Sequence, residues 1–178
     1  MVGDTKLYLL DANVLITANR DYYSMEMVPV FWEWLLYMAE LGCVKMPIET
    51  LEEVRDGGGK VKKDALVTWL NREDVYESLA LQEDADPVIV TEVIAKGYAA
   101  DLDDTELEEV GRDPFLIAYA AMDPGRRVVV SIEVSAPSKK RANRRVPDVC
   151  HDNGISVCNT FSMLRALGFT TGWVRPSP

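Results

Sequence analysis

The sequence predicts a single α/β domain with a mainly parallel sheet of four to five strands flanked by helices. Short apolar runs of strand length alternate with segments of helical periodicity along the chain, which is the pattern of βαβ units. The first run, residues 7–10, is apolar throughout, so we expect a central strand buried on both faces. The chain has 178 residues and shows no repeat or linker. We therefore expect one domain over residues 1–178, with a core at about 6–168 and a short C-terminal tail.

Each predicted element carries a local signal. Strands are expected at 7–10, 44–48, 75–79 (an edge strand), 127–131 and 155–158. Helices are expected at 12–18, 27–41, 49–55, 64–70, 87–98, 113–121 and 160–167. Pro29 suits a first helical turn, and Gly42 suits the left-handed position just past a helix end. Glycines 57–59 predict a loop, but it lacks the lysine and serine or threonine of a phosphate-binding loop.

Two of these helices carry apolar stripes that we expect to face the core rather than a ligand. In the helix at 27–41 the stripe is Phe31, Trp34, Leu35, Met38 and Leu41, and in the helix at 87–98 it is Val88, Val90, Val93 and Ile94. The segment 101–109 is densely acidic, which predicts a solvated helix and turn.

Composition limits the class of protein. Apolar residues make up 48% and charged residues 27% of the chain, as in ordinary globular domains. No apolar stretch approaches the roughly 20 residues of a membrane span, and the N-terminus does not resemble a secretory signal. We therefore expect a cytoplasmic protein. The formal charge of −10 argues against nonspecific coating of nucleic acid, but it suits an enzyme that gathers carboxylates around metal ions.

Three cysteines and one histidine make a zinc site improbable. Cys150, His151 and Cys158 lie near one another in sequence but lack the four-ligand spacing of structural zinc. Reduced thiols, buried as small apolar side chains, are the simpler interpretation of Cys43, Cys150 and Cys158.

Acidic residues follow strands or open helices at several points. Asp11 follows the first strand, Glu52 and Glu53 lie on a short helix, Asp113 opens an apolar helix, and Glu133 follows the strand at 127–131. Neighbouring strand ends lie roughly 5 Å apart, so these side chains can converge. Several carboxylates in one cleft repel one another unless a cation is present. Oxygen ligands without histidine or cysteine suit Mg²⁺ or Mn²⁺, which support phosphodiester hydrolysis.

A purely structural interpretation competes with this one. Asp11 or Asn13 can simply cap the helix that follows, and Asp113 before Pro114 has the sequence of an N-cap and first turn. Glu53 can be a solvent-facing helix residue. Capping and metal binding are compatible, because each needs only one carboxylate oxygen.

Four short motifs, in this order, resemble the PIN-domain nucleases. They are Leu9-Leu10-Asp11-Ala12-Asn13-Val14, Glu52-Glu53-Val54, Asp113-Pro114-Phe115-Leu116-Ile117-Ala118-Tyr119-Ala120, and Val129-Val130-Ser131-Ile132-Glu133. A late Val146-Pro147-Asp148-Val149-Cys150 is similar to a bacterial and archaeal PIN-like subgroup. The resemblance covers about residues 6–168. It implies a three-layer Rossmann-like fold and metal-dependent cleavage of RNA, with single-stranded DNA as another substrate. It also implies that the protein could be the toxin of a toxin–antitoxin pair, with an antitoxin protein as its partner, and that it could form a homodimer.

The resemblance also assigns roles to residues. Asp11 matches the first metal ligand, with Asn13 shaping the site, and Asp113 matches the third. Glu53 is the better match to the second acid, with Glu52 as the competing register. Ser131 and Glu133 fall where the family has Thr/Ser-x-Asp. Glutamate replaces aspartate there, so the fourth ligand stays open between Glu133 and Asp148.

Five cations cluster in the segment 139–145, which we call the basic segment: Lys139, Lys140, Arg141, Arg144 and Arg145. Such a cluster is commonly a solvated loop. On an acidic protein, and after a strand that ends near the predicted site, it is also a candidate phosphate-binding patch.

Three other functions compete with the nuclease interpretation, and the first two lack residues that their chemistry needs. A haloacid-dehalogenase-type phosphatase needs a second aspartate two residues after the first, where this chain has Asn13. A phosphate-accepting receiver domain needs an early acidic pair and a late lysine, neither of which is evident. The stronger alternative is a non-catalytic PIN-like module that binds RNA or a protein partner. A metal held jointly by Asp11 and Asp113 would favour the nuclease.

Overall fold

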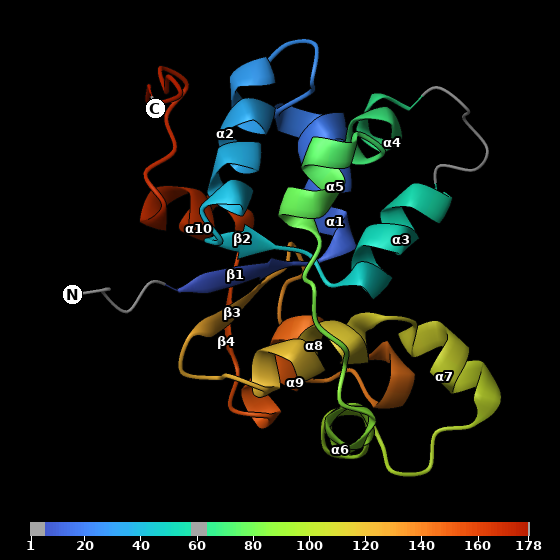
Figure 1. The fold of residues 1–178 in the computed structure, drawn as a ribbon. Coiled ribbons are helices and arrows are strands. Elements are labelled where there is room, and N and C mark those ends of the chain that lie inside the picture. Colours follow the sequence, from blue (N-terminus) through green and yellow to red (C-terminus); the bar gives the residue numbers. More distant parts are fainter. Residues whose placement is uncertain (1–5, 58–63, 178) are drawn as a thin grey trace.

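The computed structural model describes residues 6–57 and 64–177, which form a three-layer α/β domain (Figure 1). The four described strands are β1 (Leu7–Leu10), β2 (Val44–Lys45), β3 (Arg127–Val130) and β4 (Ser156–Cys158). All are parallel, in the order β2-β1-β3-β4. The predicted α/β class and parallel sheet are therefore confirmed.

Helices cover both faces of the sheet. The α-helices are α1 (Ala12–Thr17), α2 (Pro29–Glu40), α3 (Ile48–Gly57), α4 (Ala65–Leu70), α5 (Glu73–Leu79), α6 (Pro87–Gly97), α7 (Asp104–Val110), α8 (Asp113–Ala121), α9 (Val146–Asp152) and α10 (Thr160–Ala166). A π-helical turn, η1 (Ala18–Tyr22), extends α1, and a 3₁₀ turn, η2 (Arg141–Asn143), precedes α9. In Figure 1, α2, α4, α5 and α10 lie above the sheet and α6, α8 and α9 below it.

Alternation along the central strands builds two cores. Leu10 and Val130 belong to the cluster above the sheet, whereas Leu9 and Val129 belong to the cluster below it. All four side chains are fully buried. Consecutive residues near the carboxyl ends of both strands are therefore apolar, because each face of the sheet packs against helices. This is the arrangement predicted for residues 7–10.

The helix expected at 27–41 is α2 (Pro29–Glu40), and both of its predicted end signals are confirmed. Pro29 is the first residue of α2, and Gly42 has a φ of +72°, the left-handed conformation expected past a helix end. Phe31, Trp34 and Leu35 are fully buried. Leu41 is 56% exposed, so its place in the predicted stripe was wrong, because α2 ends at Glu40.

Two further expectations are corrected by the structure. Residues 75–79 belong to helix α5 and not to an edge strand, because Val75 and Leu79 are buried at helical spacing. The chain pairs only afterwards, through a single bridge between Ala80 and Met46. Val88 is 63% exposed, so only Val90 and Val93 of the predicted stripe are buried in α6.

The core continues beyond the predicted limit at residue 168. Phe169 and Trp173 pack against the upper cluster, and the Trp173 ring lies 5.5 Å from that of Tyr37 on α2. Arg175 pairs with Glu40. The predicted loop at glycines 57–59 lies mostly outside the described residues. No described helix is long and apolar enough to cross a membrane.

Candidate active site

The candidate site lies at the carboxyl edge of the sheet, where strand register brings Asp11 and Ser131 together. Leu10 pairs with Val130 across β1 and β3, so the residues that follow each strand are neighbours. The Asp11 N–H donates to the Val130 carbonyl at 3.0 Å, and the Ser131 hydroxyl donates to Asp11 Oδ2 at 2.9 Å. Asp11 is only 4% exposed. Its carboxylate is therefore held in place at the end of the central strand.

Asp11 is also the N-cap of α1, as the structural interpretation expects. Its Oδ1 accepts the Asn13 N–H at 3.5 Å, which is a long hydrogen bond. The Asn13 side chain itself is exposed. Burial raises the Asp11 pKa to about 6, against the Ser131 and Asn13 hydrogen bonds that lower it, and the charges of Glu133 and Glu53 raise it further.

Asp113 is the second strongly perturbed carboxyl. Burial first, and then the charges of Asp11, Glu133 and Glu53, raise its pKa to about 8. The prediction that Asp113 is an N-cap was wrong, because α8 begins at Asp113 itself and Arg112 occupies the cap position. In the described structure no hydrogen bond satisfies the Asp113 carboxyl. That carboxyl is thus available to a ligand.

Glu53 and Glu133 complete the set of interacting acids. Burial raises the pKa of Glu53 against the opposing charge of Arg112. Glu52 instead pairs with Arg112 at 3.5 Å, so Glu53 is the residue of the pair whose charge acts on Asp11 and Asp113. Glu133 accepts the Val146 N–H at 2.7 Å and pairs with Arg145 at 3.0 Å.

Ser131 connects two of these acids. Its hydroxyl oxygen accepts the Glu133 N–H at 3.2 Å while it donates to Asp11. A single buried side chain thereby fixes one carboxylate and the backbone of the next. Asp148, the other candidate for the fourth acid, lies apart from this arrangement. Its oxygens accept the Ser135 hydroxyl at 2.5 Å and the Ala136 N–H at 2.8 Å.

The Asp148 carboxylate therefore anchors the chain after β3. Burial opposes its ionisation, but the hydrogen bonds from Ser135 and Ala136 outweigh burial and lower its pKa. Its charge does not act on Asp11 or Asp113. Of the two candidates, only Glu133 is brought to the other acids.

The four acids Asp11, Glu53, Asp113 and Glu133 form what we call the acidic site. Its donor set consists of carboxylate oxygens, which suits Mg²⁺ or Mn²⁺. A divalent cation reduces the repulsion between neighbouring carboxylates. Over residues 6–57 and 64–177, no three acidic, cysteine or histidine side chains are already positioned to hold one ion together. The charges of these carboxylates thus act on one another, but the carboxylates are not arranged as a complete set of metal ligands.

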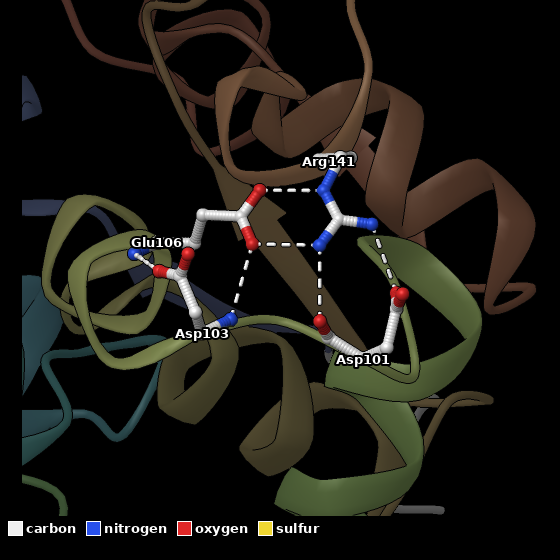
Figure 2. Close-up of polar contacts among 4 residues, drawn as sticks. All are labelled: Asp101, Asp103, Glu106 and Arg141. Atoms are coloured by element: carbon white, nitrogen blue, oxygen red, sulfur yellow. Dashed lines mark hydrogen bonds and ion pairs between the residues drawn. The ribbon is translucent and has the colours of Figure 1, made fainter.

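A cleft of about 280 Å³ opens beside Asp113 and Glu133. Lys139, Arg144 and Arg145 line it as well, so acids and cations face one space. The rest of the basic segment is largely committed to the fold. Arg141 pairs with Asp101 at 2.8 Å and with Glu106 at 2.5 Å (Figure 2), and Arg144 pairs with Asp152 at 2.6 Å.

Figure 2 shows why Arg141 is a structural residue. Glu106 also accepts the Asp103 N–H, while the Asp103 carboxylate accepts the Glu106 N–H, and this capping box starts α7. Arg141 therefore ties η2 to the beginning of α7. Lys139 and Lys140 are exposed and form no ion pair with any described residue. They are the cations of the basic segment that remain available to a phosphate.

Comparison with known proteins identifies the family. A family model described as a domain of unknown function, DUF4411, matches residues 8–171. This chain belongs to the DUF4411 family. No curated protein and no solved structure matches it. The matched region runs from β1 into the segment after α10, so all four acids and the basic segment lie inside the DUF4411 domain.

Sequence reasoning missed two DUF4411-domain residues at the acidic site. Arg112 donates to the Glu49 carbonyl at 2.7 Å and places a positive charge beside Glu53. Its position directly before Asp113 was the available signal. Tyr98, at the end of α6, is 7% exposed, and its hydroxyl is affected by the charges of Asp113 and Glu133. No pattern in the sequence distinguishes it from a core aromatic residue.

Proposed function

We propose that this protein is a Mg²⁺- or Mn²⁺-dependent phosphodiesterase that cleaves RNA. The observation that carries the proposal is the gathering of four acids in one site, where burial first and then neighbouring carboxylates raise the pKa of Asp11 to about 6 and that of Asp113 to about 8. Strongly perturbed carboxyls that share a cleft are typical of functional sites. A scaffold selected for stability alone would not gather four acids at one strand edge.

The residues of the acidic site have distinct roles in this proposal. Asp11, held by Ser131, and Asp113, at the start of α8, would hold the cation, and Glu53 and Glu133 would complete its surroundings. A bound Mg²⁺ or Mn²⁺ supplies a polarised phosphoryl oxygen and a water of lowered pKa. Near neutral pH the acidic site retains a proton, mainly on Asp113, and cation binding releases it.

The placement of cations supports a phosphate-bearing substrate. Lys139 lines the same cleft as Asp113 and Glu133, and the next residue, Lys140, is exposed. Lysine and arginine side chains hold phosphates of a nucleic-acid backbone without reading its sequence. The resemblance to PIN-domain nucleases favours RNA over single-stranded DNA. It also favours a toxin with an antitoxin partner and a homodimer.

A non-catalytic binding module is the second candidate, and one observation favours it. Glu133 is already satisfied by Arg145 and the Val146 N–H, so the fourth acid needs no cation. In such a module the basic segment would bind RNA while the acidic site stays protonated.

Cleavage of a mixed RNA pool in Mn²⁺ separates the two candidates. We expect wild type to cut RNA, Asp11→Asn and Asp113→Asn to lose activity, and Asp86→Asn to keep it. Asp86 is a matched control because it caps α6 through the Val88 N–H at 2.8 Å but is exposed and outside the acidic site. Equal activity in wild type and Asp11→Asn would reject the proposed chemistry. A single-stranded DNA pool tests the choice of RNA.

A further inference from the structure

The hydroxyl of Tyr98 is an unsatisfied buried group. The side chain is 7% exposed, and the hydroxyl oxygen has no hydrogen-bond partner within the described residues. An unpaired buried hydroxyl raises the free energy of the folded state. Such groups are uncommon in native proteins and require an explanation.

The backbone around Tyr98 is rigidly placed. Tyr98 directly follows α6, and a Cβ on the preceding Gly97 would lie 2.3 Å from Val149 Cγ1 on α9. Arg144 donates to the Gly97 carbonyl at 2.6 Å and is itself paired with Asp152. Helix α6 is thus pressed against α9 at this point. The backbone from which the Tyr98 side chain extends is therefore held in place by the fold.

Helix α6, which Tyr98 directly follows, packs against α8, the helix that begins at Asp113. Burial raises the Tyr98 pKa most, and the charges of Asp113, Cys150 and Glu133 raise it further, with Arg144 opposing them. A tyrosine surrounded by anionic groups stays protonated. Tyr98 is therefore a buried hydrogen-bond donor that has no acceptor in the described structure and is close enough to the acidic site for the charges of Asp113 and Glu133 to act on it.

Among the acids, Asp113 and Glu53 accept no hydrogen bond from a described residue, and Glu53 is exposed to solvent whereas Asp113 is only partly exposed. Asp11 accepts from Ser131 and Asn13, and Glu133 accepts from Arg145 and Val146. In the described part of the chain Asp113 accepts from no group. We infer that Tyr98 is a positioning residue that donates to the Asp113 carboxylate when this carboxylate holds a divalent cation. This inference rests on the proposed function.

The test is Tyr98→Phe, which removes the hydroxyl and keeps the buried ring. Mn²⁺ binding is measured by titration calorimetry on the full chain, and thermal unfolding is measured in EDTA. We expect Mn²⁺ affinity to fall about 10- to 100-fold, as for other residues that orient a metal ligand. In EDTA the melting temperature should stay equal or rise, because the lost hydroxyl had no partner.

Tyr119→Phe is the matched control. Tyr119 is also a buried tyrosine of the lower core, but its hydroxyl lies within hydrogen-bond distance of the Glu83 carbonyl (3.1 Å) and of Glu49 Oε1 (3.4 Å), neither of which belongs to the acidic site. This variant should lose stability in EDTA and keep wild-type Mn²⁺ affinity. The opposite pattern in the two variants separates a positioning role from a purely structural one.

Three outcomes would overturn the inference, and they do so at different levels. If wild type and Tyr98→Phe bind Mn²⁺ equally, the positioning role is wrong and the proposed function stands. If wild type binds no Mn²⁺, the proposed function fails and the role of Tyr98 fails with it. A loss of stability in EDTA as large as that of Tyr119→Phe would also contradict the inference, since the hydroxyl would then have an acceptor in the metal-free protein.

Discussion

Replacing Asp11 with asparagine should stabilise the metal-free protein. Asparagine is as good an N-cap as aspartate and can still accept the Ser131 hydrogen bond, so the substitution removes mainly the buried charge. The Asp11 pKa is raised from 3.8 to about 6, and each pKa unit corresponds to about 1.4 kcal/mol. The expected gain in the free energy of unfolding is therefore up to about 3 kcal/mol.

The pH dependence of this gain has a defined sign. Below about pH 4 both the folded and the unfolded state keep the Asp11 proton, so wild type and variant should be equally stable. Between about pH 4 and 6 the unfolded chain releases the proton while the folded chain keeps it, because the folded-state pKa is the higher one. Wild type loses stability over this window and the variant does not. Above about pH 6 the difference in the free energy of unfolding between wild type and Asp11→Asn is constant.

Urea unfolding in EDTA at several pH values measures the effect. A gain of 3 kcal/mol corresponds to about 6 to 12 °C in melting temperature for a domain of this size. Asp86→Asn, at an exposed cap, should stay within about 0.5 kcal/mol of wild type at every pH. In Mn²⁺ wild type should be more stable than Asp11→Asn, because only the folded wild type is stabilised by binding the ion. An Asp11→Asn protein less stable than wild type at pH 8 in EDTA would refute the reasoning and leave Asp11 as a structural cap.

Three further predictions follow from other contacts. Charge reversal of Lys139 and Lys140 should weaken RNA binding and flatten its salt dependence with the cleavage step intact, measured by filter binding at several salt concentrations; an unchanged salt slope would contradict it. Arg141→Glu should instead lower stability, because Arg141 pairs with Asp101 and Glu106, and an unaltered melting temperature would count against that role. Gly97→Ala should lower the free energy of unfolding by about 1 to 3 kcal/mol, because its Cβ would overlap Val149; wild-type stability in urea would show that α6 and α9 can separate freely.

The fold could be predicted from sequence where one signal dominates. The run Leu7–Leu10 is apolar at every position, and only a strand covered on both faces requires that. The convergence of Asp11 and Ser131 also follows, because parallel strands end at one edge. Residues 75–79 were misassigned because valine and tyrosine suggest a strand, whereas the burial of Val75 and Leu79 follows the helical period.

The details of the site depend on contacts that no local pattern encodes. Asp113 before Pro114 has the sequence of an N-cap, yet the helix begins one residue earlier than that pattern predicts. Five cations in seven residues suggest one surface patch, yet Arg141 and Arg144 are held by acids from distant segments. The charges of Asp113 and Glu133 act on Tyr98 because of how α6 is packed, and one such contact, between Gly97 and Val149 of α9, joins residues about 50 positions apart.

A crystal of the protein soaked in Mn²⁺ tests the central claim most directly. Asp11 and Asp113 should bind the same ion, which an anomalous difference map would locate within metal–oxygen bonding distance of both carboxylates. Glu53 or Glu133 should move towards that ion, and the same soak of Asp113→Asn should show no peak. An empty map for wild type, with Asp11 still bonded to Ser131 and Glu133 still paired with Arg145, would contradict a metal-dependent nuclease.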